Sequence, residues 1–88
     1  MQSEVIKMEF SSALDLLMCG SKVARMGWNG KNMYLVYFSP VSNGLETLDI
    51  EGEVKPLQPF IVMKTVNDTY VPWLASQSDL LANDWVEL

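Results

Sequence analysis

Two tryptophans stand where the chain is expected to turn, and they are the side chains best suited to bind a flat ligand. Trp28 precedes an Asn-Gly pair, and Trp73 follows Pro72 at the end of a predicted strand. Amides, hydroxyls and carboxylates lie close to each of them in the sequence. Apolar plates ringed by a few polar groups are typical of small-molecule sites. We interpret both tryptophans as stacking candidates, and the alternative is that both belong to the core.

Charged and hydroxyl side chains supply the rest of the candidate site. The segment after Trp73 carries a helix start, whose free backbone N–H groups can hold an anion. Arg25 is a candidate for a phosphate clamp or a solvated charge, and Thr65 for a ribose contact or a surface hydroxyl. The candidate ligand-binding residues are Arg25, Trp28, Asn29, Tyr34, Thr65, Trp73, Ser76, Gln77 and Asp79.

Catalytic chemistry has one candidate, a carboxylate pair formed by Asp79 and Asp84. Hydrolysis of a glycosidic bond needs two carboxyl groups about 5–9 Å apart. The competing interpretation is structural, because Asp79 suits a helix start and Asp84 follows the helix end. The chain has no histidine, so the commonest general base is missing, together with one of the ligands of a Cys/His metal site. We therefore predict no catalytic residue, no metal and no cofactor.

The composition predicts one small domain that self-associates. The chain has 88 residues, of which 49% are hydrophobic. A domain of this size buries only about 60% of its unfolded surface, so this surplus of apolar residues predicts an oligomer. The net charge of −5 argues against DNA or RNA polymers as partners, but not against a single nucleotide. No signal peptide core and no membrane span is recognisable, so we expect a soluble intracellular protein.

The first predicted element is a short helix over residues 12–19. Its apolar residues follow helical spacing, Ser11 or Ser12 is placed to cap its start, and Gly20 is placed to end it in the left-handed conformation. Cys19 is the only cysteine, so no internal disulfide can form, which fits a reducing cytoplasm. We interpret its side chain as a small buried hydrophobe.

A hairpin is expected next. Residues 22–28 and 31–38 have the pattern of strands, and the Asn29-Gly30 pair between them is the strongest short hairpin signal. The second strand has apolar side chains on both faces. Such a strand is expected to be buried on both faces, within the domain or at a subunit interface.

The second half of the chain adds a long loop, three strands and a helix. Residues 39–59, rich in Pro, Gly and acidic side chains, have the pattern of a long loop with a weak strand at 45–50. A hairpin is predicted from residues 60–65 and 69–71. These two strands and the first pair account for most of a predicted antiparallel sheet.

The last predicted elements are a helix over residues 77–82 and a strand over 85–88 that closes the sheet. Ser76 is expected to cap the helix, with Asp79 completing a capping box. Trp85 lies among aliphatic residues and is assigned to the core. The fold class is α+β, a mostly antiparallel sheet of about five strands with two short helices.

Two stretches of the chain resemble a small family of phage and prophage proteins, the second Thoeris anti-defence family described. The first is KVARMGWNGK over residues 22–31, and the second is VPWLASQSDLLANDW over residues 71–85. The likeness covers roughly residues 10–38 and 59–86. Residues 39–58 find no clear match in it.

The resemblance implies a sponge that is not an enzyme. Such proteins bind a cyclic ADP-ribose derivative, a glycocyclic ADP-ribose signal made by bacterial TIR-domain proteins, in the cytoplasm of the infected host. The resemblance also implies a homotetramer with ligand pockets between protomers. Some members of the family hold cyclic dinucleotides at separate sites as well.

On this reading the candidate residues take specific roles. Trp28 or Trp73 would stack on adenine, and the helix start at residues 76–78 would face a pyrophosphate. Arg25 would add charge. The residues expected at the ribose hydroxyls are Asn29, Gln77 and Asp79.

Two other function classes stay open at this stage. One is a protein-interaction module that inhibits a host enzyme through an apolar surface, which would form a stable complex with its partner. The other is a small nucleotide hydrolase that uses Asp79 and Asp84, which would generate product over time.

Overall fold

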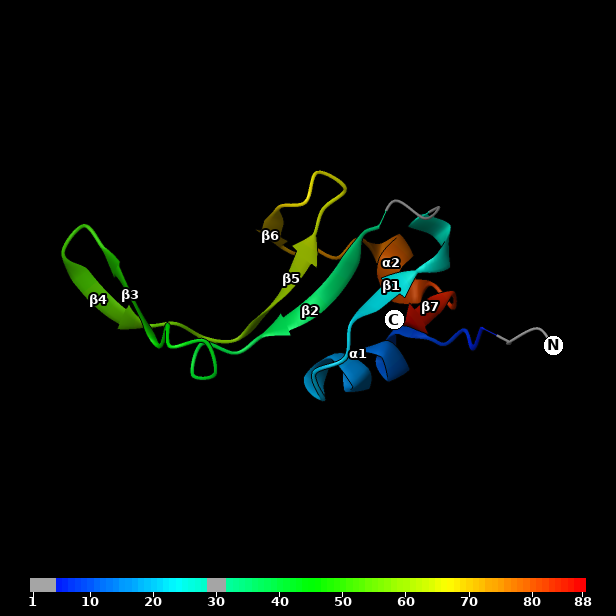
Figure 1. Ribbon diagram of the computed structural model, residues 1–88, viewed down its shortest axis with the longest axis horizontal. Helices are drawn as coiled ribbons and strands as arrows, with labels where there is room; N and C mark the ends of the chain where they lie inside the picture. The colour runs from blue at the N-terminus through cyan, green and yellow to red at the C-terminus, as the bar shows by residue number, and fades with distance from the viewer. Residues whose placement is uncertain (1–4, 29–31) are drawn as a thin grey trace.

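The computed structural model describes residues 5–28 and 32–88, which form a five-stranded sheet, a separate two-stranded hairpin and two helices (Figure 1). The elements in chain order are α1 (Phe10–Met18), β1 (Val23–Arg25), the 3₁₀ turn η1 (Met26–Trp28), β2 (Tyr34–Phe38), β3 (Thr47–Ile50), β4 (Glu53–Pro56), β5 (Phe60–Lys64), β6 (Tyr70–Pro72), α2 (Gln77–Leu81) and β7 (Trp85–Glu87). The predicted α+β class is confirmed. Neither helix of the described residues has the length and apolar character needed to cross a membrane.

The main sheet is antiparallel throughout, in the order β6-β5-β2-β1-β7. Its centre is the β2–β5 pair, in register from Tyr34 opposite Lys64 to Phe38 opposite Phe60. Valine and aromatic residues dominate these strands, as a pleated and half-buried surface favours. β1 and β2 pair as the predicted hairpin, whereas its Asn29-Gly30 turn lies outside the described residues.

The strand predicted over residues 22–28 is shorter in the structure, because its second half turns into η1. The backbone N–H of Met26 donates to the carbonyl oxygen of Asp84 (3.0 Å), and that of Gly27 donates to Asp84 Oδ2 (2.8 Å). These bonds hold the turn against the segment that leads into β7. Trp28 therefore lies on a helical turn and not at a strand end.

Helix α1 lies against the sheet through Ala13 and Leu17, which are fully buried and four residues apart on one helix face. Gly20 has a φ of +96° and its N–H donates to the carbonyl of Leu17 (2.9 Å), so the predicted left-handed end is confirmed. The helix begins at Phe10, earlier than predicted. The predicted serine cap is wrong, because Glu9 holds the cap position and makes no side-chain cap bond.

The predicted burial of Cys19 is also wrong, because its side chain is exposed. Cys19 lies after the last helical residue, at the cap position, where its backbone N–H still donates to the carbonyl of Asp15 (3.2 Å). A residue at this position no longer follows the buried stripe of the helix. Its side chain therefore faces solvent.

The core lies between α1 and one face of the sheet. Its fully buried members come from α1, β1, β2 and β7: Ala13, Leu17, Val23, Leu35 and Trp85. Partly buried side chains of β2 and β5, among them Tyr37, Ile61 and Met63, pack against this cluster. The assignment of Trp85 to the core is confirmed.

The other face of β2, β5 and β6 carries mostly apolar side chains, and we call it the open face. By strand alternation and register it consists of Tyr34, Val36, Phe38, Phe60, Val62, Lys64, Tyr70 and Pro72. A groove of about 460 Å³ opens on it. Within this chain the second strand is therefore covered by α1 on one face only, and burial of its other face at a subunit interface stays a prediction.

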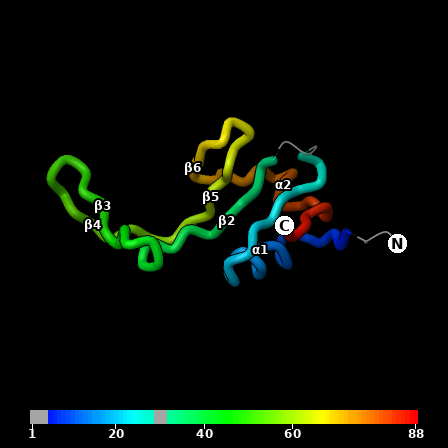
Figure 2. Tube along the Cα trace, viewed as in Figure 1, coloured from blue at the N-terminus to red at the C-terminus, as the bar shows by residue number. Residues whose placement is uncertain are grey.

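The stretch predicted as a long loop contains a β-hairpin that projects from the body, which we call the arm (residues 45–57; Figures 1 and 2). The weak strand predicted there is present as β3, and β4 pairs with it around Glu51 and Gly52, both at positive φ. Asp49 Oδ1 accepts a hydrogen bond from the Gly52 N–H (3.1 Å) and supports the turn. The arm makes the molecule elongated, with extents of 56 × 25 × 24 Å.

Candidate functional site

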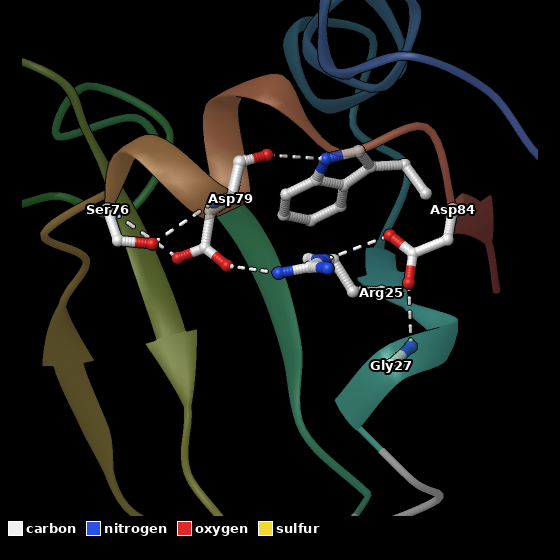
Figure 3. Close-up of polar contacts among 6 residues, drawn as sticks. Arg25, Gly27, Ser76, Asp79 and Asp84 are labelled. Carbon is white, nitrogen blue, oxygen red and sulfur yellow. Dashed lines mark hydrogen bonds and ion pairs between the residues drawn. The ribbon is translucent and has the colours of Figure 1, made fainter.

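Arg25 joins the two C-terminal carboxylates into one network (Figure 3). Its Nε donates to Asp84 Oδ1 and its Nη1 donates to Asp79 Oδ1, both at 2.9 Å. The second carboxylate oxygen of Asp84, Oδ2, accepts a hydrogen bond from the backbone N–H of Gly27 (2.8 Å). The arginine thus connects β1 to the start of α2 and to the entry of β7. All three side chains are about one-fifth exposed.

Nearby side chains accept hydrogen bonds from the backbone N–H groups at the start of α2. Asp79 donates its backbone N–H to Ser76 Oγ (3.1 Å), and Ser76 donates its backbone N–H to Asp79 Oδ2 (3.3 Å), so the predicted capping box is confirmed. The indole Nε1 of Trp85 donates to the carbonyl oxygen of Asp79 (3.0 Å), which ties the helix to the core. The hydrogen bonds of Ser76 and Asp79 therefore stabilise the start of α2.

The same network sets the charge state of its members. Partial burial raises the pKa of Asp79, but hydrogen bonds from Arg25 and Ser76 outweigh it and lower that pKa overall. The hydrogen bond from Arg25 lowers the pKa of Asp84, against a smaller effect of burial and with help from the Gly27 N–H. The pKa of Arg25 is raised by its bonds to the two carboxylates. All three groups are charged at neutral pH.

These shifts predict a loss of stability in acid. Because both carboxyl pKa values are lower in the folded than in the unfolded state, their contribution is complete above the unfolded pKa of about 4 and is lost as pH falls through the folded values. Urea unfolding at pH 7, 5 and 3 should show the unfolding free energy falling mainly between the last two points. The Asp79→Asn/Asp84→Asn variant should fall less steeply, and parallel curves for the two proteins would contradict this assignment.

A hydrolytic role for the carboxylate pair finds no support in this geometry. Glycosidic hydrolysis requires one carboxylic acid to stay protonated, which means a raised pKa. Here a shared arginine lowers the pKa of both Asp79 and Asp84. The network is better described as a cross-link between segments that are far apart in the sequence.

The two candidate stacking tryptophans flank the buried one. The rings of Trp28 and Trp85 lie edge to face with centroids 5.5 Å apart, and those of Trp73 and Trp85 do so at 5.9 Å. Phe10 completes the cluster, 5.5 Å from Trp73. Trp28 and Trp73 are each half-buried. Their packing on the core is observed, while their contact with a ligand stays a prediction.

Tyr34 lies apart from these residues, on the open face between two lysines. Lys22 Nζ is 4.7 Å from the centroid of the Tyr34 ring, and Lys64 Nζ is 5.9 Å from it. Lys64 is buried, donates to the carbonyl oxygen of Asn32 (2.9 Å) and lies 3.5 Å from Asp68, whose side chain is exposed. Two cations therefore converge on one aromatic ring in a chain of net charge −5.

The groove of the open face lies farther along β2, β5 and β6, beyond Tyr34. Phe38 and Phe60 form a tilted pair with centroids 5.2 Å apart, and Tyr70 stands exposed on the edge strand. The interaction of Tyr70 with Tyr34 raises the pKa of the Tyr70 phenol. The open face thus offers aromatic surfaces along its length, with two ammonium groups at its Tyr34 end. This combination can hold a ligand that has both a flat ring and phosphates.

The structure brings together some predicted site residues and separates others. Arg25, Ser76 and Asp79 meet in the network, with Trp73 and Trp28 near it around Trp85. Thr65 lies at the β5–β6 turn, where its hydroxyl hydrogen-bonds to that of Thr69 (2.7 Å). Gln77 is exposed in the first turn of α2, and Asn29 lies outside the described residues.

Sequence reasoning missed most residues of the open face. They include Phe38, Phe60, Lys64 and Tyr70, and Lys22, which lies against Tyr34, was missed as well. One signal was present, namely the apolar character of both faces of the strand that contains Tyr34. Which strands lie beside it depends on the pairing of residues nearly thirty positions apart. The pattern of a single strand does not contain that information.

Comparison with known proteins gives two concordant matches. A family model described as the Thoeris anti-defense 2-like domain matches residues 8–88. The chain is also 39% identical over 82 residues to a protein of Bacillus phage SP01 described as Thoeris anti-defense 2, with 90% of this chain and 92% of that protein covered. Both matches run through the arm as well as the body.

Proposed function

Because this chain belongs to the Thoeris anti-defense 2-like family, we propose that it is a phage anti-defence protein that sequesters a nucleotide signal. The signal is a cyclic ADP-ribose derivative, of the glycocyclic ADP-ribose type, that TIR-domain proteins make in the infected bacterium. The protein binds it in the host cytoplasm and does not cleave it. The downstream effector is then deprived of its activator.

The observation that carries this proposal is the open face. A cyclic ADP-ribose derivative combines an adenine ring with a pyrophosphate. Tyr34, Phe60 and Tyr70 supply flat surfaces of the kind on which bases stack, and the exposed Lys22 beside Tyr34 supplies charge for the phosphates. Lys64 is buried and already bonded to Asn32 and Asp68, so its part is to hold the Tyr34 end of the face in place. Arg25 is less suited to a phosphate, because it already donates to two carboxylates.

Binding without turnover follows from the same set of groups. The chain contains no histidine, and the two aspartates that Arg25 joins are held ionised by it. A protein that removes a signal by mass action needs affinity and no chemical step.

The open face also bears on assembly. A mostly apolar surface on a monomer is costly to leave in water and marks an interaction site. We place the ligand pockets of a homotetramer at this face, where a second protomer would close them. Cyclic dinucleotides are a second proposed ligand class, held at a separate site.

The direct test is retention of nucleotide through desalting. The protein is incubated with glycocyclic ADP-ribose, cyclic ADP-ribose or a cyclic dinucleotide, desalted and read at 260 nm, and the bound molecule is then released by heat. We expect the cyclic ADP-ribose derivative to be retained and to be recovered intact by chromatography. Recovery of a cleaved product would show a hydrolase, and no retention of any nucleotide would favour a protein-interaction module.

Two variants test the assignment to the open face. Tyr70→Ala should weaken binding of glycocyclic ADP-ribose about 5- to 150-fold, the equivalent of a lost base–aromatic stack of about 1–3 kcal/mol. Lys22→Met should weaken it with a reduced dependence on salt concentration, because a phosphate contact is lost. Titration calorimetry measures both effects. Tyr70 is 68% exposed, so its variant should retain the parent melting temperature.

Leu81→Ala is the matched control, since Leu81 is 83% exposed on α2 and away from the open face. It should bind like the parent. If Trp73→Phe loses more affinity than Tyr70→Ala, the ligand lies at the tryptophan cluster instead. Parent-like binding by both Tyr70→Ala and Lys22→Met would overturn the placement on the open face.

A further inference from the structure

The turn that leads from β2 to the arm holds the amide of Asn43 at the groove of the open face. Asn43 lines that groove together with Phe38 and Phe60. Its backbone N–H donates to the carbonyl oxygens of Ser39 and Pro40 (both 3.2 Å), and its side-chain Nδ2 donates to the carbonyl oxygen of Ser39 (2.8 Å). The orientation of the amide is therefore fixed by its own turn before a ligand arrives.

The middle of the groove is apolar. Val36 and Val62 lie opposite each other there. The Phe38–Phe60 pair lies on one side of the two valines, toward the turn, and Tyr70 lies on the other side. Apolar and aromatic surfaces of this kind suit the faces of a purine ring, which are flat and can stack. What distinguishes one purine from another is then left to the polar groups at the rim.

Among the described residues that line the groove, two side chains bring polar atoms to it, those of Asn43 and Tyr70. Tyr37 also lines the groove, but its side chain packs against the core on the other face of the sheet. The Tyr70 phenol interacts with that of Tyr34, which raises the pKa of Tyr70. The bond to Ser39 uses one N–H of Nδ2, so Asn43 offers a ligand one further N–H donor and the acceptor Oδ1.

This donor and acceptor match one edge of adenine. Adenine presents the N6 amino donor beside the N7 acceptor, and an asparagine amide pairs with both at once. Hypoxanthine and guanine carry an oxygen at position 6, so their edge presents two acceptors and Oδ1 would meet another oxygen. A site built to hydrogen-bond one group rejects an analogue that lacks it, because its own polar atoms are then left unpaired.

We propose that Asn43 selects adenine over 6-oxopurines when a nucleotide binds to the open face. Oδ1 accepts a hydrogen bond from the N6 amino group and Nδ2 donates one to N7, while the ring lies over Val36 and Val62. The phosphates then extend toward Lys22 at the Tyr34 end of the face. This assignment rests on the proposed function and adds to it the end of the open face that takes the base.

The test compares glycocyclic ADP-ribose with its hypoxanthine analogue, in which an oxygen replaces the N6 amino group. Titration calorimetry should show the parent binding the adenine ligand about 5- to 150-fold more tightly than the analogue. Asn43→Ala should bring the two affinities close together. A purely structural role of Asn43 in its turn would instead weaken both ligands alike, and the ratio of the two affinities would stay that of the parent.

Two further variants sharpen the comparison. Ser42→Ala is the matched control, because Ser42 is exposed in the same turn and lies outside the set of described residues that line the groove. It should keep the parent's ratio of affinities. Asn43→Lys should shift the preference toward the hypoxanthine analogue, because a lysine ammonium donates to the oxygen at position 6 and to N7. Circular dichroism melting of each variant verifies that the fold is retained.

The outcomes separate this assignment from the function on which it rests. If the parent binds neither ligand, the proposed nucleotide binding fails and the role of Asn43 fails with it. If the parent binds glycocyclic ADP-ribose but does not discriminate between the two bases, only the role of Asn43 is wrong. The same holds if Asn43→Ala keeps the parent's ratio of affinities.

Discussion

Replacing Trp85 with alanine should lower the free energy of unfolding by about 3–5 kcal/mol, enough to unfold much of the protein at 37 °C. Trp85 is fully buried and lies within 6 Å of Phe10, Trp28 and Trp73, measured between ring centroids. Its indole N–H also anchors the Asp79 carbonyl. The substitution therefore removes the centre of an aromatic cluster and the attachment of α2.

Thermal denaturation measures this effect, since 1 kcal/mol shifts the melting temperature of a domain this small by about 4–8 °C. Trp85→Phe should recover part of the loss, because it keeps an aromatic ring but not the N–H donor. Trp28→Ala and Trp73→Ala should cost less, because each ring is only half-buried. A Trp85→Ala protein that melts within a few degrees of the parent would show that the cluster is not the stabilising centre.

The second large effect is expected from Arg25→Met, which should cost about 2–4 kcal/mol of unfolding free energy. The substitution leaves two carboxylates facing each other with no cation between them. The value lies below that for a fully buried pair because the three side chains are about one-fifth exposed. Methionine keeps most of the apolar stem, so the loss reports mainly on charge and hydrogen bonds.

Urea unfolding at pH 7 measures this cost, and a further substitution supplies the control. Adding Asp79→Asn to Arg25→Met should return part of the lost stability, because one of the two unpaired charges is then removed. The same aspartate substitution in the parent should be destabilising. Equal effects of Asp79→Asn in both backgrounds would show that Arg25 and Asp79 are not coupled.

Features with local causes were predictable from the sequence. The capping box of Ser76 and Asp79, the left-handed Gly20 and the burial of Trp85 each depend on neighbouring residues and on hydrophobic pattern. The predicted burial of Cys19 was wrong because the residue lies one position beyond the end of the helix, where its side chain is exposed. The predicted start of the first helix was wrong because Ser11 and Ser12, which suit a cap, lie inside the helix, and Glu9 occupies the cap position.

Features with non-local causes were not predictable. The Arg25 network joins residues up to 59 positions apart, and nothing around Arg25 distinguishes a cross-link from a phosphate clamp. The arm was assigned to a loop with one weak strand because the stretch is rich in Pro, Gly and acidic side chains, and its hairpin register becomes visible only when both strands are paired. The lysines at Tyr34 come from β5 and from the residue just before β1, the elements on either side of β2.

The pairing of β1 with β7 also has a consequence for how the chain folds. β7 forms the edge of the sheet beside β1, so Val23 lies opposite Glu87, and Arg25 opposite Trp85. Loop-closure entropy opposes such a contact, although each doubling of the loop adds only about 0.6 kcal/mol. We expect contacts of this separation to form late, because the entropy cost of closing the loop comes before any stabilising contact is made. The β2–β5 and β5–β6 pairs can assemble first, and the docking of β7 with Trp85 is then the step that completes the core.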